Sequence, residues 1–323
     1  MHSGSRLKNT FYKVDIIPMK KYPVLLIVIM ILTACKSQPP QKIPEKILEK
    51  MPVSKLEFNR IEANGIHNII LHYHFNSENP RTSSVVMTIQ GWKIVVNNRE
   101  IDLEGAILKN NETVFSNIQV TTAAGKVYET DFELHLDLKS ILNTISGDKS
   151  GSAFQADDID SYTSELILDV SFRYGTEQPM IEHIKAITEF PRIREPEFSI
   201  SSIAIMQAEL INTRFAVTLT IDNRNTFPVT LSSFNYELYG HNLYWADGNE
   251  KNVLTIPAKN SEQKRLLLMM NFINMKRSLL DEIIAMRQVS YRFTGAARVE
   301  TGIQWLPQFE MVFDKSGYSE VVQ

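Results

Sequence analysis

The stretch that decides the fold is residues 215–240, FAVTLTIDNRNTFPVTLSSFNYELYG. Its first part alternates apolar and polar residues, which is the pattern of a half-buried β-strand. Polar residues at 222–225 end this alternation, and Pro228 lacks the N–H group that a strand ladder needs. A second apolar and aromatic run extends from Leu231 to Leu238. We therefore predict two strands joined by a polar corner.

The composition is that of an ordinary globular protein. The chain has 323 residues, of which 43% are hydrophobic and 22% are charged, and its formal net charge is −3. This length suggests about two domains. The nearly balanced charge gives no electrostatic reason to expect nucleic acid as a partner. The single cysteine, Cys35, excludes an intrachain disulfide and a thiolate metal cluster, and we predict no cofactor.

The N-terminal region has the layout of a secretory signal peptide. Basic residues at 19–21 precede an apolar stretch at 22–34, which is shorter than the roughly 20 residues of a transmembrane helix. Residues 1–18 contain acidic and aromatic side chains that do not suit such a signal, so Met19 is the expected start. We predict a signal peptide over residues 1–34.

The end of this region resembles the lipobox of bacterial lipoproteins, in the residues Leu32, Thr33, Ala34 and Cys35. The resemblance implies that Cys35 is lipidated and becomes the first mature residue. Two or more acyl chains would anchor it stably, because each buried CH₂ contributes about 0.8 kcal/mol. We therefore expect the membrane as a partner through Cys35, and a location in the cell envelope. Lys36 follows the cysteine and favours the outer membrane, and residues 35–53 form a tether rich in Pro, Lys and Glu.

The remaining chain reads as one unit that occurs twice. The sequence VSFRY at 170–174 recurs as VSYRF at 289–293, an offset of 119 residues. The alternating run at 69–75 matches 215–221 at an offset of 146 residues. The order of the matches is preserved along the chain, so the first copy is the same unit with longer loops.

Each copy combines many short strands with one short helix, expected at residues 139–145 and 275–286. This pattern predicts a mainly β protein with two tandem antiparallel β-sandwiches, residues 54–194 and 195–320. The boundary falls at residues 191–196, where two prolines bracket charged residues.

In its corner, its aromatic strand and its closing strands at residues 290–317, the second copy resembles the LEA-2 family, also called the WHy domain (water stress and hypersensitive response). The Asn-Pro-Asn corner of that family corresponds here to Asn223, Arg224 and Asn225, so the central proline is replaced. Residues 77–80 of the first copy depart further from the pattern. The resemblance implies an immunoglobulin- or fibronectin-like sandwich, no catalytic residues, and roles in stress protection, at membrane surfaces or in lipid handling.

His72 and His74 alternate on one predicted strand, so both imidazoles face the same side and could hold a metal ion with His135. At the offset of 146 residues they match Thr218 and Thr220, which belong to a polar strand face. We therefore favour a solvent-facing surface over a metal site.

Two further clusters have a functional and a structural interpretation. Asp157, Asp158 and Asp160 offer the oxygen ligands that Ca²⁺ prefers, but they lack the twelve-residue calcium loop, so a solvated acidic loop is favoured. Four aromatic residues could line a ligand cleft, although sandwich core and rim is the favoured interpretation: Trp92, Tyr236, Tyr244 and Trp245. Trp245 lies next to Asp247 and Gly248, and we expect it to be the exposed one.

The sequence contains no nucleophile elbow and no glycine-rich phosphate loop. We predict a non-catalytic lipoprotein of the cell envelope that acts as a protective or interaction module at the membrane surface, with an envelope protein or a lipid as partner. The second hypothesis is a carrier of lipid or another apolar ligand. The third is a metal-dependent enzyme that uses His72 and His74.

Overall fold

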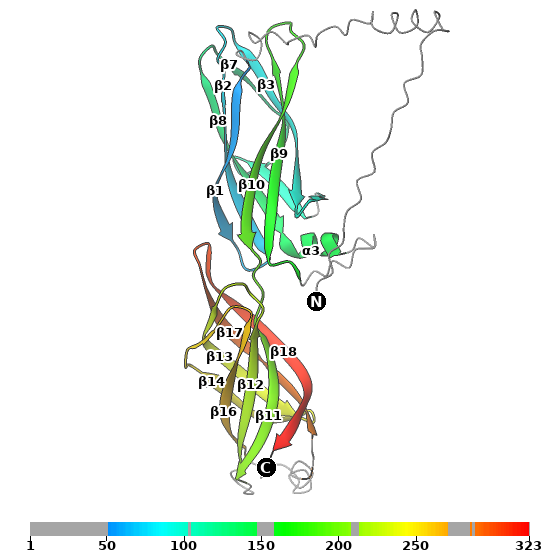
Figure 1. Ribbon diagram of the computed structural model, residues 1–323, viewed down its shortest axis with the longest axis vertical. Helices are drawn as coiled ribbons and strands as arrows, with labels where there is room; N and C mark the ends of the chain where they lie inside the picture. The colour runs from blue at the N-terminus through cyan, green and yellow to red at the C-terminus, as the bar shows by residue number, and fades with distance from the viewer. Residues whose placement is uncertain are drawn as a thin grey trace, which may run out of the picture. The chain divides into compact units, whose positions relative to one another are not determined.

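The computed structural model describes residues 51–102, 105–146, 158–207, 213–270, 285 and 288–322 (Figure 1). The part of the chain that the structure describes is mainly β, with 73% strand and one short helix, which confirms the predicted fold class at this level. None of the helices in the described ranges combines the length and hydrophobicity needed to cross a membrane. The predicted signal peptide and the predicted lipobox with Cys35 lie outside the described residues, as do the predicted tether up to residue 50 and, apart from residue 285, the helix expected at 275–286.

The N-terminal half (β1–β10) consists of two antiparallel sheets. The first sheet has the order β1 (Val53–Ala63), β2 (Asn68–Glu78), β8 (Val127–Asp137), β5 (Ala106–Asn110) and β6 (Thr113–Val114). The second has the order β10 (Met180–Pro191), β9 (Ser161–Arg173), β3 (Val85–Val96) and β4 (Arg99–Ile101), with β7 (Ile118–Thr122) paired to β3. One buried core draws side chains from both sheets.

Local sequence explains these elements. In β2 the side chains of Leu71, Tyr73 and Phe75 are fully buried, and the residues between them face outward, as the period of two requires. Helix α3 (Leu138–Ser146) begins at Asp137, whose Oδ1 accepts hydrogen bonds from the N–H groups of Lys139 (2.9 Å) and Ser140 (3.3 Å). The helix expected at residues 139–145 is therefore confirmed to within one residue at each end.

The C-terminal half (β11–β18) is one eight-stranded sheet around a second core. Its strands are β14 (Leu243–Glu250), β13 (Val229–Gly240), β17 (Gln288–Ile303), β18 (Leu306–Val322), β11 (Glu197–Gln207), β12 (Thr213–Asn223) and β16 (Asn260–Met270), in this order, with β15 (Leu254–Ile256) paired to β13. The sheet is antiparallel, as predicted, except at one pairing, where residues 202–204 of β11 pair in parallel with residues 320–322 of β18. This pairing joins what would otherwise be two sheets and leaves β14 and β16 as the free edges.

The register of the closing strands differs from the predicted one. Val86 pairs with Arg173, and Thr230, 144 residues after Val86, pairs with Glu300. Arg173 and Glu300 therefore occupy equivalent places 127 residues apart, so the predicted offset of 119 residues is wrong. The error is an even number of residues, which preserves the inward and outward faces and so cannot be detected from alternation alone.

Candidate functional site

A groove lies between the two free edges of the C-terminal sheet, β14 and β16, and we call it the edge groove. It encloses about 890 Å³, within the range of small-molecule pockets. Its lining includes three buried or nearly buried apolar side chains and three more exposed ones: Trp245, Leu266, Leu268, Tyr244, Leu267 and Met269. One end is closed by an ion pair between Lys264 and Glu250 at 3.5 Å.

Trp245 lies buried beside this groove, so the prediction that it is exposed is wrong. Its side chain is only 4% exposed, and its ring stacks on Phe215 with centroids 5.8 Å apart. The reason is a bulge: Leu238 pairs with Ala246 and Tyr239 with Tyr244, so Trp245 is the extra residue and its ring turns inward.

The neighbouring glycine makes room for this ring. A Cβ atom on Gly240 would lie 2.0 Å from a carbon of the Trp245 ring, so only glycine fits there. The indole Nε1 of Trp245 is buried and has no hydrogen-bond partner among the described residues.

Three of the four aromatic residues predicted from the sequence meet at the edge groove, namely Tyr236, Tyr244 and Trp245. Tyr244 is 48% exposed and donates a hydrogen bond to the Asp247 carboxylate, which raises the pKa of Tyr244 to about 12. Burial raises the pKa of Tyr236, with further contributions from nearby carboxylates. Both phenols are therefore neutral near pH 7. The fourth, Trp92, packs against the core of the N-terminal half.

The corner predicted from the sequence is a buried hydrogen-bond hub. Asn223 Nδ2 donates to the carbonyl oxygens of Phe227 (2.9 Å), Ile256 (3.2 Å) and Pro257 (3.0 Å). Its Oδ1 accepts from the backbone N–H of Asn225 at 3.0 Å. The corner asparagine therefore holds its own turn together and joins it to the backbone at residues 256–257.

Asn79 in the N-terminal half makes the same set of bonds. Its Nδ2 donates to the carbonyl oxygens of Ser83 (2.8 Å), Thr122 (3.1 Å) and Ala123 (3.2 Å). Its Oδ1 accepts from the backbone N–H of Arg81 at 3.1 Å. Asn79 and Asn223 lie 144 residues apart. Their matching hydrogen bonds therefore indicate an offset of 144 residues at this corner, whereas the sequence predicted 146. The sequence placed Asn79 and Pro80 in the corner of the first copy but treated that corner as a departure from the family pattern, so the role of Asn79 was not predicted.

The two halves belong to one compact unit, residues 51–323, and they meet around Asp160 and Arg194. The Arg194 guanidinium donates to Asp160 Oδ1 (2.9 Å), to the carbonyl of Arg224 (3.1 Å) and to the carbonyl of Ile159. Lys259 donates to the same Asp160 oxygen at 2.6 Å. Asp160 therefore has two cationic partners, which the expectation of a solvated acidic loop did not include. Asp158 is exposed, as that expectation requires, and Asp157 lies outside the described residues.

The second corner asparagine completes this junction. Asn225 Oδ1 accepts from the backbone N–H of Arg194 at 2.7 Å, and Asn225 Nδ2 donates to the Arg194 carbonyl at 2.9 Å. These two bonds satisfy both the N–H and the C=O group of Arg194 in the linker, as a neighbouring strand would. The corner therefore ties the linker to the C-terminal half, and Arg194 ties the same linker to the N-terminal half.

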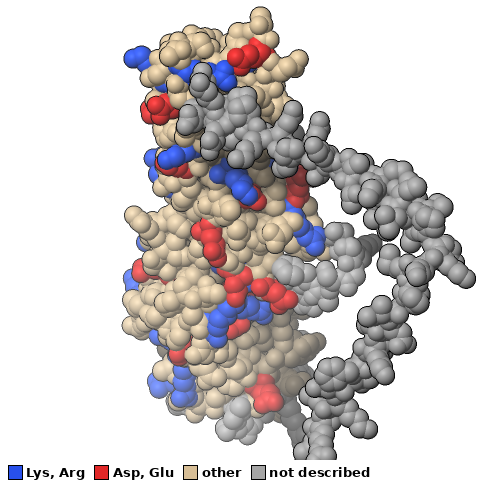
Figure 2. Space-filling view, turned by 45° about the horizontal axis from the view of Figure 1, so that its top comes forward, with Lys and Arg blue, Asp and Glu red and all other residues tan. Residues whose placement is uncertain are grey.

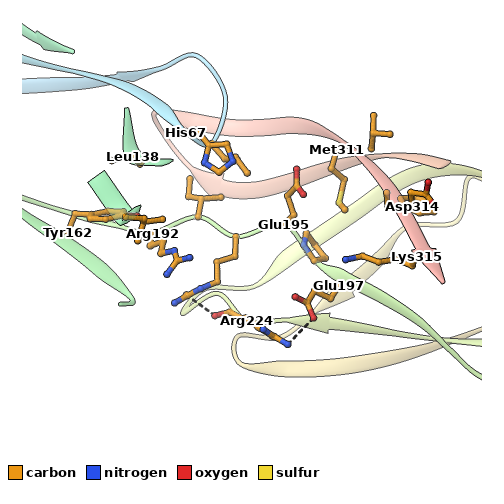
Figure 3. A pocket seen from close by; sticks show the side chains of 17 residues that line it. His67, Leu138, Tyr162, Arg192, Glu195, Glu197, Arg224, Met311, Asp314 and Lys315 are labelled. Atoms are coloured by element: carbon orange, nitrogen blue, oxygen red, sulfur yellow. Dashed lines mark hydrogen bonds and ion pairs between the residues drawn. The ribbon is translucent and has the colours of Figure 1, made fainter. Parts of the chain in front are cut away.

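A cavity of about 430 Å³ lies beside this junction (Figure 3). Its wall mixes charged side chains of both signs with apolar ones, including His67, Tyr162, Arg192, Glu195, Glu197, Arg224, Met311 and Lys315. Arg224 forms an ion pair with Glu197 at 2.8 Å. The same mixing of signs covers the face shown in Figure 2, as expected from the nearly balanced charge of the chain.

The junction is expected to weaken in acid. Hydrogen bonds from Lys259 and Arg194 hold the pKa of the Asp160 carboxyl below its ordinary value of 3.8. A lowered pKa in the folded state adds stability above pH 3.8, which is lost as the pH falls through the folded-state pKa. We expect D160N to have a lower urea midpoint than the wild type at pH 7, and this difference to shrink toward pH 2 to 3, measured by circular dichroism. A difference that stays constant over this range would contradict the assignment.

His72 and His74 lie on the outward face of β2 among carboxylates, with side chains 14% and 30% exposed, so they face solvent less than the favoured interpretation predicted. The Nε2 atom of His72 lies 3.4 Å from Glu62, and the Nδ1 atom of His74 lies 2.8 Å from Asp131. His135 contacts Glu133 at 3.3 Å. Among the described residues, no group of three or more His, Cys, Asp or Glu side chains is arranged to hold a metal ion.

Comparison with known proteins identifies part of the chain. Residues 218–311 match the family model described as late embryogenesis abundant protein, so this part is a LEA_2 domain. The comparison with curated proteins finds no match.

Several solved structures show distant similarity. A protein from Archaeoglobus fulgidus is 16% identical and covers 39% of this chain and 99% of its own, with a TM-score of 0.25. The periplasmic chaperone SfaE is 11% identical and covers 84% of this chain and 99% of its own, with a TM-score of 0.22. Red sea bream transglutaminase is 10% identical over 84% of this chain and 32% of its own, with a TM-score of 0.22. We draw no functional argument from similarities at this level.

Proposed function

We propose that this chain is a non-catalytic lipoprotein of the cell envelope that acts at the membrane surface as a protective and interaction module. The observation that carries this proposal is the LEA_2 domain at residues 218–311. That domain includes the edge groove and the exposed apolar side chains of Leu267 and Met269 beside it. Exposed apolar groups of this kind are typical of surfaces that meet other molecules.

The matching corners support a tandem arrangement of two related domains, 54–194 and 195–320. Asn79 and Asn223 use the same amide atoms to bond three carbonyls each, at equivalent places in the two halves. Sharing one local hydrogen-bond pattern is easiest to explain when both halves descend from one unit. The junction at Arg194 then holds two such units in one protein.

The lipid anchor is tested by replacing its cysteine. We expect C35A to move the protein from the membrane fraction to the soluble fraction, because the acyl chains that anchor it can no longer be attached. The measurement is cell fractionation followed by immunoblotting, with mass spectrometry of the wild-type N-terminus to detect the acyl chains. A matched control is S37A, which alters a neighbouring polar residue and leaves the lipobox intact. Retention of C35A in the membrane would overturn the anchor.

The protective role is tested with a protein that aggregates on heating. We expect the full chain, reconstituted in nanodiscs, to delay aggregation of such a protein, followed by light scattering. Empty nanodiscs and nanodiscs that carry an unrelated lipoprotein are the controls. Equal aggregation with and without the chain would reject the protective role.

A second candidate function is the carriage of lipid or another apolar ligand. The edge groove supports it, because its volume of about 890 Å³ and the aromatic side chains of Tyr236, Tyr244 and Trp245 in its lining suit a long apolar molecule. The test is solvent extraction of the purified protein and mass spectrometry of the extract. A stoichiometric lipid in the extract, absent from a variant with the groove filled, would favour this function over the protective one.

A further inference from the structure

The two halves of strand β16 differ in how they protect a free sheet edge. The first half carries Glu262, Lys264 and Arg265, and charges of this kind discourage the pairing of other strands. The second half, residues 266–270, reads LLLMM and has no charge, proline or bulge. Leu267 is 72% exposed and Met269 is 64% exposed. Only residues 266–270 of β16 therefore remain open to pairing with another strand.

The backbone of β16 is used on one side only. All eleven residues pair with β12, and no other described strand pairs with β16. In an antiparallel ladder, alternate residues point their N–H and C=O groups away from the partner strand. In β16 these groups point toward the side where the edge groove lies. An added strand would satisfy them, and its alternate side chains would enter the groove next to Trp245 and Leu268.

We propose that residues 266–270 of β16 bind an extended apolar peptide segment of another protein as an added β-strand, with alternate side chains of that segment in the edge groove. This inference rests on the proposed protective function and names the site and the partner class. The segment needs about five consecutive apolar residues without proline. Its inward side chains meet Leu268 and Trp245, and its outward side chains meet Leu267 and Met269, so both of its faces are apolar.

Backbone chemistry favours a peptide over an acyl chain at this site. A peptide strand offers a donor and an acceptor at every second residue, and these match the open groups of β16. An acyl chain would bury the same groups without partners, which costs about 1–3 kcal/mol for each. Segments with this composition are also the ones that aggregate when a protein unfolds, which connects the site to a protective role.

Arg265 favours an acidic residue at one end of the bound segment. Its guanidinium donates to the sulfur of Met206 at 3.8 Å, and it forms no ion pair within the described part of the chain. A segment that runs antiparallel to β16 has its C-terminal end opposite Arg265. An acidic residue at that end of the segment would therefore bind more favourably than a basic one.

The probe is a peptide with a fluorophore on its N-terminus and the sequence Gly-Val-Ile-Val-Leu-Val-Asp, followed by fluorescence anisotropy with the full chain in nanodiscs. We expect saturable binding that empty nanodiscs do not give. A peptide with proline at the central valine is expected to bind at least 10-fold more weakly, because it loses a donor and the extended conformation is interrupted. Equal binding of the two peptides would overturn the proposal.

The matched variants are L267K with M269K, and V312K. Val312 on β18 is also an exposed apolar residue, at 80%, but it lies outside the edge groove. We expect at least a 10-fold loss of affinity in the double variant and no change in V312K. Because all three side chains are exposed, the substitutions leave the core intact. A similar loss in both variants, or in neither, would overturn the proposal.

Hydrogen exchange on the unmodified chain gives a second readout. Added strand pairing should slow exchange of amides within residues 260–270 when the peptide is present, and palmitate should not. If palmitate protects these amides and the peptide does not, the groove is a lipid site and the proposal fails. If the double variant still delays aggregation as well as the wild type, the site is wrong although the protective function stands. If the wild type gives no delay, the protective function itself fails, whatever the peptide result.

Discussion

Replacing Asn223 with alanine is expected to lower the free energy of unfolding by about 3 kcal/mol or more, because each buried polar group left without a partner costs about 1–3 kcal/mol. The Asn223 amide bonds three carbonyl oxygens and accepts the N–H of Asn225. Alanine leaves all of these groups unpaired in a site where Asn223 is fully buried. The measurement is urea unfolding followed by circular dichroism and tryptophan fluorescence.

A matched control separates this effect from the loss of any asparagine. Asn76 is half-buried on β2, and no side-chain hydrogen bond of its own is present among the described contacts. We expect N76A to change the free energy of unfolding by no more than about 0.5 kcal/mol. If N223A and N76A have similar effects, the corner hub does not stabilise the fold in the way proposed.

The same experiment at Asn79 tests whether the two corners are equivalent. Asn79 makes three matching carbonyl bonds and also accepts the hydroxyl of Tyr174 at 3.1 Å. N79A should therefore cost at least as much as N223A. If N79A has only a small effect, the two corners have the same hydrogen-bond geometry but do not contribute equally to the free energy of unfolding. This result would weaken the proposal of a tandem repeat.

Much of the fold could be predicted from sequence because it depends on local alternation. The corner at residues 222–225, the strands on both sides of it and the helix at 139–145 each follow from the order of apolar, polar and turn residues. These features need only a few neighbouring residues to be correct. The mainly β class and the linker at residues 191–196 follow in the same way.

Register could not be predicted, because alternation repeats every two residues. Matching VSFRY to VSYRF aligns Phe172 with Tyr291, but Phe172 pairs with Met87 near the start of β3, whereas Tyr291 pairs with Gly240 at the end of β13. Any even shift keeps each side chain on its face, so local similarity gives no preference among such shifts. Only the partners across the sheet and the bonds of the corner asparagines determine the correct register.

The edge groove was only partly predictable for a related reason. The sequence suggested that Tyr236, Tyr244 and Trp245 share a cleft, and the structure brings them together. It did not predict which ring is buried, because the bulge at Trp245 depends on the pairing of Leu238 and Tyr239 across the sheet. The parallel pairing of β11 with β18, which joins the strands into one sheet, links residues more than 100 positions apart and leaves no local signal.

Replacing Arg194 with alanine is expected to uncouple the two halves and to cost about 1.5–3 kcal/mol, the range for losing a hydrogen bond to a charged group, because Asp160 is itself 41% exposed. The Arg194 side chain is only 9% exposed, and its guanidinium bonds Asp160 together with two backbone carbonyls. Lys259 remains bonded to Asp160 in the variant, which places the expected cost toward the lower end of this range. The wild type should unfold in one transition, because the junction transmits the folding of one half to the other.

The variant should instead show two transitions by differential scanning calorimetry, one for each core. R60A is the control, because Arg60 is 63% exposed and bonds only the neighbouring Glu62, so a single transition should remain. The linker bonds to Asn225 use the backbone of Arg194 and survive the substitution, so the linker should stay attached to the C-terminal half. If the double variant R194A with N223A loses the transition at lower temperature and keeps the one at higher temperature unchanged, the transition at lower temperature belongs to the C-terminal half. A single unshifted transition in R194A would mean that the junction around Asp160 does not couple the two cores.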